Sequence, residues 1–482
     1  MIINRTETRH FRCGLLVILL SFFASQSDAS YLHAKGSKLY NDKGQVVQLT
    51  GVNWFGFETS NLGPHGLWAR DYHGMLRQVK SMGFNCIRIP FCNSMLRDGA
   101  KVRSINFYGE DPYYQRDKNL MNCELAGLTP IQIMDEIISY AGKLGLAVIL
   151  DNHSREPDGY MEERLWYTKV TSEQQWIDDW VMLAKRYNNN HAVIGFDLNN
   201  EPHGKIKDGG ASWGTGNTLS DWNTAAQKCG NAILAVNSNV LIIIEGVEQV
   251  GSTSYWWGGN LRGVATHPIV LSKKEKLVYS PHEYGPEVFQ QPWFDDSAFP
   301  DNMEAIWDQS FGFISRLNIA PLFIGEFGIN DMKSYNNKAG IWFTRFLKYM
   351  ADHSLSWTFW SLNPNSGDTG GMLKYDWVSI EQWKLDALKP WLAPEVIEPA
   401  AVQKRQPRSI SKGKHLKIAD GIITLSEIPS GKIKMRVATI SGKVIFSSSI
   451  QPLNIKKLPK GIYTAAVYQN DVLIESLTFA AD

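Results

Sequence analysis

Eight short apolar runs alternate with longer amphipathic segments between Gln48 and Leu388, and this alternation limits the folds open to the chain. The runs are 49–53, 85–89, 147–150, 193–198, 240–244, 277–280, 322–325 and 357–360. The helical patterns between them include 72–81, 131–143, 172–187, 224–236, 304–316 and 340–351. Strands that alternate with helices pair in parallel, and continuous hydrophobicity marks strands buried on both faces. Eight repeats favour a closed (β/α)₈ TIM barrel over an open sheet.

The composition changes after Trp391. Residues 394–411 are rich in proline and polar side chains and are typical of a linker. Residues 412–482 contain no Trp or Cys, and their short alternating segments are separated by turn residues, which predicts a small all-β, sandwich-like module. From Lys404 onward, 13 Lys or Arg face 5 Asp or Glu, so this part is basic. A separate partner or address is one interpretation of that charge, and a solvated basic face is the other.

The N-terminus is typical of an export signal. Three arginines precede an apolar run from Gly14 to Leu20, and small residues at 27–29 offer a cleavage site before Ser30. The run is shorter than the ~20 residues needed to span a bilayer, so we expect no membrane span in the mature chain. The predicted division is therefore a signal peptide over 1–29, a barrel over 30–393, a linker over 394–411 and a β module over 412–482. Outside the cell disulfides are permitted, and Cys92 with Cys123 would close one loop.

Charge and cysteine spacing argue against several classes of function. A net charge of +1 gives no reason to expect nucleic acid, and the cysteine spacings form no metal-binding set. All 17 Trp lie between Trp54 and Trp391. We expect about half of them in the core and the others on surfaces that stack against flat sugar faces.

Two glutamates stand in similar contexts. Glu201 in FDLNNEP and Glu326 in FIGEFG each follow an apolar run and precede turn-forming residues. In a barrel of parallel strands such residues lie at the C-terminal mouth, where catalytic groups are found. Two carboxyl groups facing each other across a sugar ring can cleave a glycosidic bond, one as proton donor and the other as nucleophile. Direct attack requires them to lie ~5–5.5 Å apart.

Further polar and aromatic residues fall at the ends of the same predicted strands, namely Arg88, His153, Asn200, His282, Tyr284 and Trp360. We expect Asn200 to bind a sugar 2-hydroxyl, Arg88 to lower the pKa of Glu326, and Trp360 to form the floor under the sugar. Each has a structural alternative, such as a helix cap, a buried ion pair or core packing. Their joint placement favours a site. Four nearby acids compete for attention: Asp151, Asp197, Glu245 and Glu283. We expect Asp197 to be structural, and neither Asp197 nor Glu283 to be a primary catalyst.

The segments NCIRIPF (85–91), ILDNH (149–153), FDLNNEPHG (196–204), YSPHEY (279–284), FIGEFG (323–328) and WTFWSLN (357–363) resemble glycoside hydrolase family 5. The resemblance covers about 31–392, and SYWWGGNLRG (254–263) is most similar to the bacterial endo-β-1,4-glucanases. It implies Glu201 as acid/base, Glu326 as nucleophile and the six residues above as active-site positions. It also implies retention of configuration with no metal or cofactor, and a β-glucan polysaccharide as substrate.

An endo-acting enzyme needs a cleft longer than one sugar. Candidate outer platforms are Trp54, Trp213, Trp256 and Trp257, and the last two, being adjacent, cannot both face the sugar from an extended backbone. A mannanase, or a glucanase acting on mixed or other β-linkages, stays open as an alternative, as does a non-catalytic carbohydrate-binding protein. We expect a secreted or cell-surface monomer.

The closing segment LPKGIYTAAVYQNDVLIESLTFA (458–480) resembles the C-terminal sorting domains of type IX secretion substrates. That resemblance implies secretion machinery as a partner of the module. Those domains commonly end in a basic residue, whereas this chain ends in Ala-Ala-Asp.

Overall fold

The computed structural model describes residues 31–115, 119–158, 161–330 and 337–397, and in the C-terminal region 416–419, 422–425, 433–439, 444–448, 453–454, 456, 458–469 and 472–481. The predicted signal peptide over 1–29 and most of the predicted linker lie outside the described residues. Among the described residues, none of the helices combines the length and the apolar character needed to cross a membrane.

Eight parallel strands form the central sheet, in the order β11-β8-β7-β6-β5-β4-β13-β12. They are β4 (Thr50–Asn53), β5 (Cys86–Cys92), β6 (Ala147–Ser154), β7 (Val193–Asp197), β8 (Leu241–Glu245), β11 (Leu277–Ser280), β12 (Phe323–Ile324) and β13 (Ser356–Phe359). A parallel bridge between Tyr279 and Leu322 joins the two ends of this order, so the sheet is a nearly closed barrel. Every residue of these strands is buried. The predicted barrel is confirmed, and each of the eight apolar runs overlaps one of its strands.

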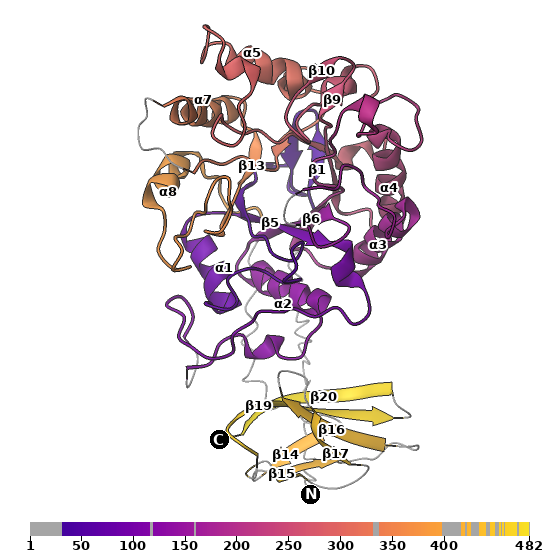
Figure 1. Ribbon diagram of the computed structural model, residues 1–482, viewed down its shortest axis with the longest axis vertical. Helices are drawn as coiled ribbons and strands as arrows, with labels where there is room; N and C mark the ends of the chain where they lie inside the picture. Colours follow the sequence, from indigo (N-terminus) through magenta and orange to yellow (C-terminus); the bar gives the residue numbers. More distant parts are fainter. Residues whose placement is uncertain are drawn as a thin grey trace, which may run out of the picture.

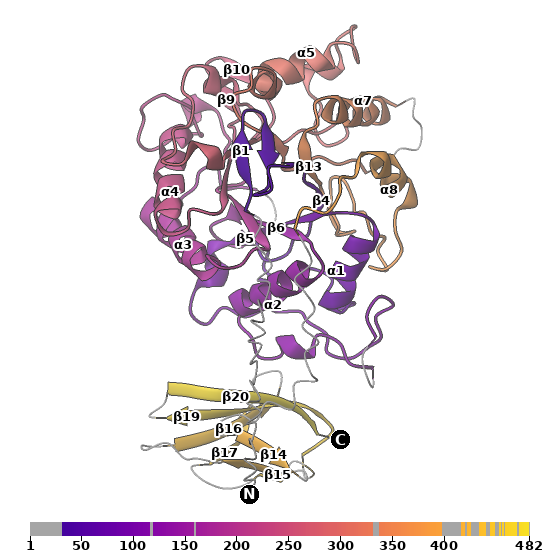
Figure 2. The ribbon, with the colours of Figure 1, turned by 180° about the vertical axis from the view of Figure 1, so that it is seen from behind.

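Helices surround the strands on all sides (Figures 1 and 2). They are α1 (Tyr72–Ser81), α2 (Pro130–Lys143), α3 (Glu173–Arg186), α4 (Trp222–Val236), α5 (Met303–Trp307), α6 (Phe313–Arg316), α7 (Lys338–Asp352) and α8 (Gln382–Leu388). Side-chain caps fix several of their first turns, because Asp71, Ser172 and Asn337 accept backbone N–H groups of α1, α3 and α7. The pattern over 304–316 forms two short helices, α5 and α6, joined by a π-helical turn over Asp308–Gly312.

Two small antiparallel additions accompany the barrel. Strands β1 (His33–Lys35), β2 (Lys38–Tyr40) and β3 (Val46–Val47) form an N-terminal sheet. Strands β9 (Gln249–Val250) and β10 (Thr253–Ser254) form a hairpin in the loop after β8. This hairpin comes directly before Tyr255, Trp256 and Trp257, so it fixes where the tryptophan pair enters the mouth of the barrel.

No disulfide joins any two of the four cysteines among the described residues. Cys92 is buried at the end of β5, where its Sγ lies 3.3 Å from the carbonyl oxygen of Phe57. The Sγ of Cys123 instead lies 3.5 Å from the carbonyl oxygen of Met121. The predicted Cys92–Cys123 disulfide is therefore wrong, because each thiol is turned toward a backbone oxygen of its own surroundings.

The C-terminal region is all-β. Strands β14 (Leu416–Ala419), β15 (Ile422–Leu425) and β18 (Leu453–Asn454) form one sheet, and β17 (Val444–Ser448), β16 (Ile433–Thr439), β19 (Gly461–Gln469) and β20 (Val472–Ala481) form a second. Side chains of both sheets share an apolar cluster that includes Leu416, Ile423, Val437 and Val467. The predicted small antiparallel module is confirmed.

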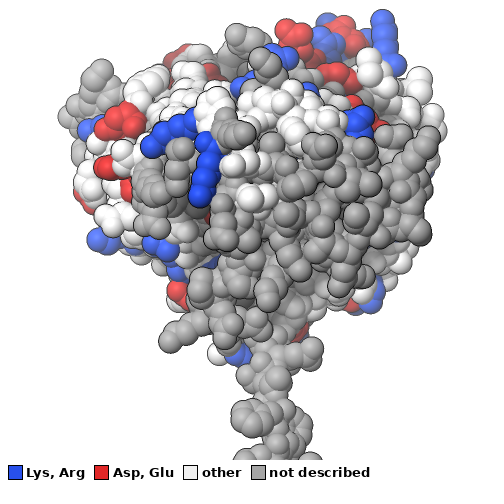
Figure 3. All heavy atoms as spheres, turned by 90° about the horizontal axis from the view of Figure 1, so that it is seen from below, with Lys and Arg blue, Asp and Glu red and all other residues white. Residues whose placement is uncertain are grey.

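Where described residues are visible from below, basic and acidic side chains are interspersed (Figure 3).

Candidate active site

The candidate site lies at the C-terminal mouth of the barrel. All eight strands are parallel, so their carboxyl ends meet on one side. The residues predicted from the sequence come together there, from β5 (Arg88), β6 (His153) and the segments directly after β7, β11, β12 and β13 (Asn200, Glu201, His282, Tyr284, Glu326 and Trp360). The contacts described below join seven of these eight residues into one network, and Trp360 packs against it.

Glu201 and Glu326 face each other across a short gap. One side-chain atom of each, together with a ring nitrogen of His282, lie within 4.8 Å of one another. His282 Nδ1 is 2.8 Å from Glu201 Oε1 and 3.7 Å from Glu326 Oε2. Both carboxyl groups thus border one space, and their separation suits direct attack on a sugar carbon better than the wider gap that an intervening water needs.

The surroundings of Glu326 favour its ionised form. Arg88 Nη1 donates to Glu326 Oε1 over 2.7 Å, and the Tyr284 hydroxyl donates to Oε2 over 2.7 Å. Burial alone would raise the pKa of Glu326, but the charges of His282, Arg88 and His153 and the bond from Tyr284 outweigh it and lower the pKa. Both oxygens of this carboxylate are therefore held in place and negatively charged.

Arg88 is the cationic centre of the site and is fully buried. Besides Glu326, its guanidinium contacts three buried acids, Asp151 at 3.1 Å, Asp197 at 3.0 Å and Glu245 at 3.2 Å. Burial lowers its pKa, but these acids raise it well above the ordinary value, so Arg88 stays charged. Asp197 is an ion-pair partner inside the barrel, as expected for an acid that is not a primary catalyst.

The amide of Asn200 is oriented by the same guanidinium. Arg88 Nη2 donates to Asn200 Oδ1 over 2.9 Å, which leaves the Nδ2 donor directed at the sulfur of Met161, 3.5 Å away. A thioether is a weak acceptor. A sugar hydroxyl would be a better partner for this donor.

Glu245 carries more of the site than its place in the sequence indicated. It is the last residue of β8, and its Oε2 accepts the backbone N–H of Glu201 over 2.7 Å. Its Oε1 lies 3.3 Å from His282 Nε2. Glu201 has a φ of 43°, a left-handed conformation that is uncommon for a residue with a side chain. Burial raises the pKa of Glu245 to about 7, against the opposing charge of His282. Glu245 thus holds the backbone from which Glu201 projects.

His153 lies beside Glu326 and packs against Trp360. Asp151 Oδ2 lies 2.7 Å from His153 Nδ1, and the imidazole is parallel to the Trp360 ring at a centroid distance of 5.6 Å. Burial lowers the pKa of His153, but Asp151 and other nearby acids raise it to about 9. Among those acids is Glu58, whose own pKa is raised by burial to about 7. The sequence analysis missed Glu58, although it too follows a strand end.

The four candidate platforms divide into buried and exposed rings. Trp54 and Trp213 are 1% and 4% exposed, and their indole nitrogens donate to backbone oxygens of His65 and His267. Both are therefore core residues, and the expectation that they stack on sugar is corrected. Trp256 is 7% exposed, whereas Trp257 is 39% exposed. Of the adjacent pair, Trp257 presents its ring to solvent.

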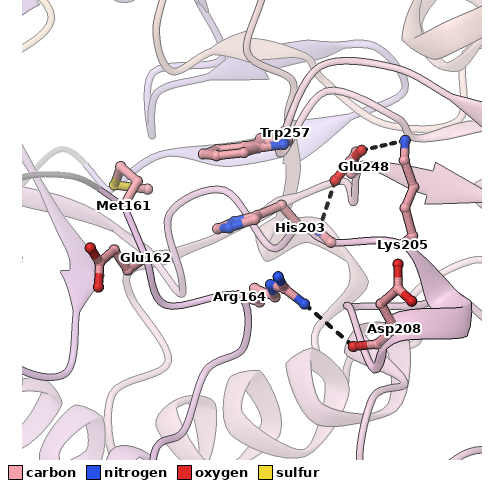
Figure 4. A pocket seen from close by; sticks show the side chains of 9 residues that line it. Met161, Glu162, Arg164, His203, Lys205, Asp208, Glu248 and Trp257 are labelled. Atoms are coloured by element: carbon pink, nitrogen blue, oxygen red, sulfur yellow. Dashed lines mark hydrogen bonds and ion pairs between the residues drawn. The ribbon is translucent and has the colours of Figure 1, made fainter.

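A pocket of about 430 Å³ lies beside Trp257 (Figure 4). The Trp257 ring stacks on His203 at 3.9 Å and 11°, and the other side chains that line the pocket are Met161, Glu162, Arg164, Lys205, Asp208 and Glu248. His203 Nδ1 lies 2.8 Å from the carbonyl oxygen of Glu201. Gly258, with a φ of +65°, has room for no side chain, since a Cβ would lie 2.2 Å from Glu245 Oε2. The pocket thus adjoins Glu201 rather than Glu326.

Three sets of acids and histidines in the described part of the chain are close enough to share a metal ion: Asp151, His153 and Glu326; Asp197, Glu245 and His282; and Glu201, His282 and Glu326. The Arg88 guanidinium contacts an acid of each set, and it would repel a cation. The contacts among these acids and Arg88 are those of buried ion pairs.

Comparison with known proteins gives the family. The cellulase model of glycosyl hydrolase family 5 matches residues 40–366. An endoglucanase from Paenibacillus polymyxa is 47% identical over 76% of this chain and 88% of its own length. The major extracellular endoglucanase of Xanthomonas campestris is 42% identical, over 75% and 71%. A solved endocellulase from Pyrococcus horikoshii is 39% identical with a TM-score of 0.69, over 76% of this chain and 99% of that one.

The chain belongs to the cellulases of glycosyl hydrolase family 5 and is a hydrolase. A Pyrococcus horikoshii structure that is 38% identical, with a TM-score of 0.68, is a complex with cellotetraose. These relatives match the barrel. They cover about three quarters of this chain, so about a quarter of it is unmatched.

Proposed function

We propose that the protein is a secreted endo-β-1,4-glucanase that cleaves internal bonds of cellulose or related β-glucans with retention of configuration. The observation that carries the mechanism is the pair Glu201 and Glu326, with side-chain atoms within 4.8 Å of each other and unlike surroundings. Glu326 is held ionised by Arg88 and Tyr284. The names of the relatives, endoglucanases and endocellulases, support the substrate class.

In the first step, a carboxylate oxygen of Glu326 attacks the anomeric carbon, and the bond from that carbon to the leaving oxygen breaks. Glu201 gives its proton to that oxygen, so the shortened chain leaves as an alcohol. In the second step, Glu201 takes a proton from water while the water oxygen attacks the same carbon and Glu326 departs as a carboxylate. Two inversions restore the original configuration.

The other residues position the sugar. The Asn200 amide, fixed through its oxygen by Arg88, offers an N–H to the 2-hydroxyl. Trp360 lies beneath the sugar that reacts. Trp257 lies on the Glu201 side, where the leaving group departs, and serves as the platform for the sugars beyond the cleaved bond. Sugar-binding surfaces on both sides of the scissile bond are what an endo-acting enzyme requires.

Variants of the two glutamates test the assignment. Glu326→Ala and Glu201→Ala should each lower turnover of cellohexaose by about a thousandfold or more, while binding of the oligosaccharide persists. On an aryl cellobioside whose leaving group departs without a proton, added azide should rescue both variants with opposite outcomes, giving a β-glycosyl azide from Glu201→Ala and an α-glycosyl azide from Glu326→Ala. Glu173→Gln, a change of a distant acid that accepts the indole N–H of Trp166, is the control. Wild-type turnover by Glu326→Ala would contradict the nucleophile assignment.

The alternatives are separated by substrate. Parallel assays on carboxymethyl cellulose, mannan and mixed-linkage glucan should show the highest rate on a β-1,4-glucan. Cleavage of mannan alone would replace the proposal by a mannanase. A protein that binds all three polymers and releases no reducing ends would be a carbohydrate-binding protein.

Export of the chain and sorting by its C-terminal module complete the proposal. The word extracellular in the name of the Xanthomonas relative supports export, and the resemblance of 458–480 to sorting domains supports a role for the module. Mass spectrometry of the protein in the culture medium should find a mature N-terminus at Ser30. Deletion of 412–482 should leave the enzyme in the cell envelope fraction if the module is the address.

A further inference from the structure

Tyr375 is the aromatic side chain that the described barrel exposes most plainly. Its exposed fraction is 80%, compared with 64% for Phe289 and 39% for Trp257. A single exposed apolar side chain is ordinary. What distinguishes Tyr375 is the rigidity of its backbone and the hollow beside it.

The turn that carries Tyr375 is held by a dense set of hydrogen bonds. Lys374 N donates to Ser379 O over 2.7 Å, and Trp377 N donates back to Lys374 O over 2.8 Å. The Asp376 carboxylate accepts the N–H groups of Val378 and Ser379, at 2.9 and 2.8 Å. The turn is therefore closed on itself, and the ring of Tyr375 projects from a fixed backbone.

A buried arginine anchors this turn to the barrel. Arg70 is 1% exposed and donates to the carbonyl oxygen of Trp377. Asp111 and Gln78 hold the same guanidinium, at 2.7 and 2.8 Å. A platform fixed before the ligand arrives loses little conformational freedom on binding, and an aromatic ring supplies a large flat surface.

A hollow of about 690 Å³, here called the Tyr375 hollow, lies beside the turn. Trp383 of α8 contributes a second ring, and Lys374, Asp376, Glu381 and Ser366 contribute polar groups. Lys384 Nζ fixes the base of the hollow, since it donates to Thr369 O over 2.7 Å and lies 5.4 Å from the Trp383 ring centroid. Flat rings combined with a few polar groups suit a sugar chain, which has apolar faces and a rim of hydroxyls.

The hollow is connected to the catalytic centre through one loop. Ser366, which lines the hollow, accepts the indole N–H of Trp360 over 3.1 Å. Asp368 lies in the same loop. Its pKa is raised mainly by burial and further by the negative charge of Glu326. The hollow therefore adjoins the loop that contacts Trp360.

From these observations we infer that the Tyr375 hollow is a second β-glucan-binding site, which holds a distant stretch of a long chain while the cleft cuts another. Tyr375 would stack on one sugar, and the polar groups would bind its hydroxyls. The inference rests on the proposed β-glucan substrate, and it adds a role in the capture of long chains.

The test compares long and short substrates in the full-length enzyme. Tyr375→Ala should lower the ratio of kcat/KM on hydroxyethyl cellulose to that on cellotetraose by about fivefold, the loss expected for one stacked ring. Tyr375→Phe keeps the ring and should keep the ratio. Tyr108→Ala, which removes a tyrosine that is 50% exposed outside the hollow, is the matched control.

Binding is measured in the Glu326→Ala background, so that the polymer stays intact. Affinity electrophoresis in hydroxyethyl cellulose should show weaker retardation when Tyr375→Ala is added, and unchanged retardation with Tyr375→Phe. Wild-type ratio and retardation for Tyr375→Ala, or equal losses with Phe and Ala, would overturn the inference. Failure of the wild type to cleave hydroxyethyl cellulose, with Tyr375-dependent retardation preserved, would instead count against the proposed catalytic function and support the site.

Discussion

Replacement of Glu245 by glutamine tests whether Glu201 depends on a neighbour for its position. The glutamine oxygen can still accept the Glu201 N–H, now 2.7 Å from Glu245 Oε2. Its NH₂ group then faces two other donors, Arg88 Nη2 at 3.2 Å and His282 Nε2 at 3.3 Å. Two charge-assisted contacts, each worth about 1.5–3 kcal/mol, are lost. Some of that loss appears as reduced stability.

The effect on catalysis follows from the backbone of Glu201. Glu201 has a φ of 43°, and the Glu245 side chain holds its backbone N–H. A glutamine that has lost its contacts with Arg88 and His282 holds this N–H less firmly, so Glu201 relaxes and about 1–2 kcal/mol of transition-state stabilisation is lost. That corresponds to a kcat about 5- to 30-fold lower. KM should change little, because Glu245 is fully buried and has no surface to offer substrate.

The pH dependence gives a second measurement of the same effect. Burial raises the pKa of Glu245 to about 7. Well below that pH the native carboxyl carries a proton and resembles the amide, so the defect of Glu245→Gln should shrink at pH 5 and grow at pH 8. The assay is kcat and KM on cellohexaose at both values, with Glu173→Gln as control. Wild-type kcat at pH 8, in a variant with unchanged melting temperature, would refute the reasoning.

Three further changes have defined outcomes. Tyr284→Phe removes one of two short bonds to Glu326, so the pKa of Glu326 should rise by about one to two units, and the acid limb of the kcat/KM profile should move to higher pH; an unmoved limb contradicts this. Burial raises the pKa of Glu283 to about 7, so its contribution to stability is fully present below the unfolded pKa and is lost as pH rises through about 7. Between pH 5 and 8, the free energy of unfolding of the wild type should therefore fall by on the order of 3 kcal/mol more than that of Glu283→Gln. Melting curves at several pH values measure this, and an equal pH dependence of the two proteins would count against it. Trp257→Ala should raise KM for cellohexaose about fivefold and shift the cleavage pattern, whereas an unchanged product ratio would remove Trp257 from the cleft.

The barrel and the placement of Glu201 and Glu326 could be predicted from the sequence because their signals are local. A buried parallel strand needs a continuous apolar run, and a residue just after the run must lie at the mouth. This reasoning placed Glu201 and Glu326, and it placed Arg88 and Tyr284 as well. The roles of these residues stay proposals.

The direction of a side chain at the mouth could not be predicted in the same way. His282 points inward, while Glu283 points outward and accepts the indole N–H groups of Trp307 and Trp342, at 2.9 and 3.1 Å. The contacts of Glu245 could not be predicted, because an acid at a strand end can point into the barrel or away from it. Trp54 stands directly after β4 but turns into the core, since position after a strand does not determine exposure. Tyr375 lies in a turn whose anchor, Arg70, is distant in the sequence.

The configuration of the first product tests the central claim most directly. Proton NMR of cellohexaose hydrolysis, recorded before mutarotation, distinguishes the anomers at the new reducing end. Glu201 and Glu326 acting in turn on one carbon require the β-anomer to accumulate first. Initial accumulation of the α-anomer would mean that water attacks directly, and the assignment of Glu326 as nucleophile would be wrong.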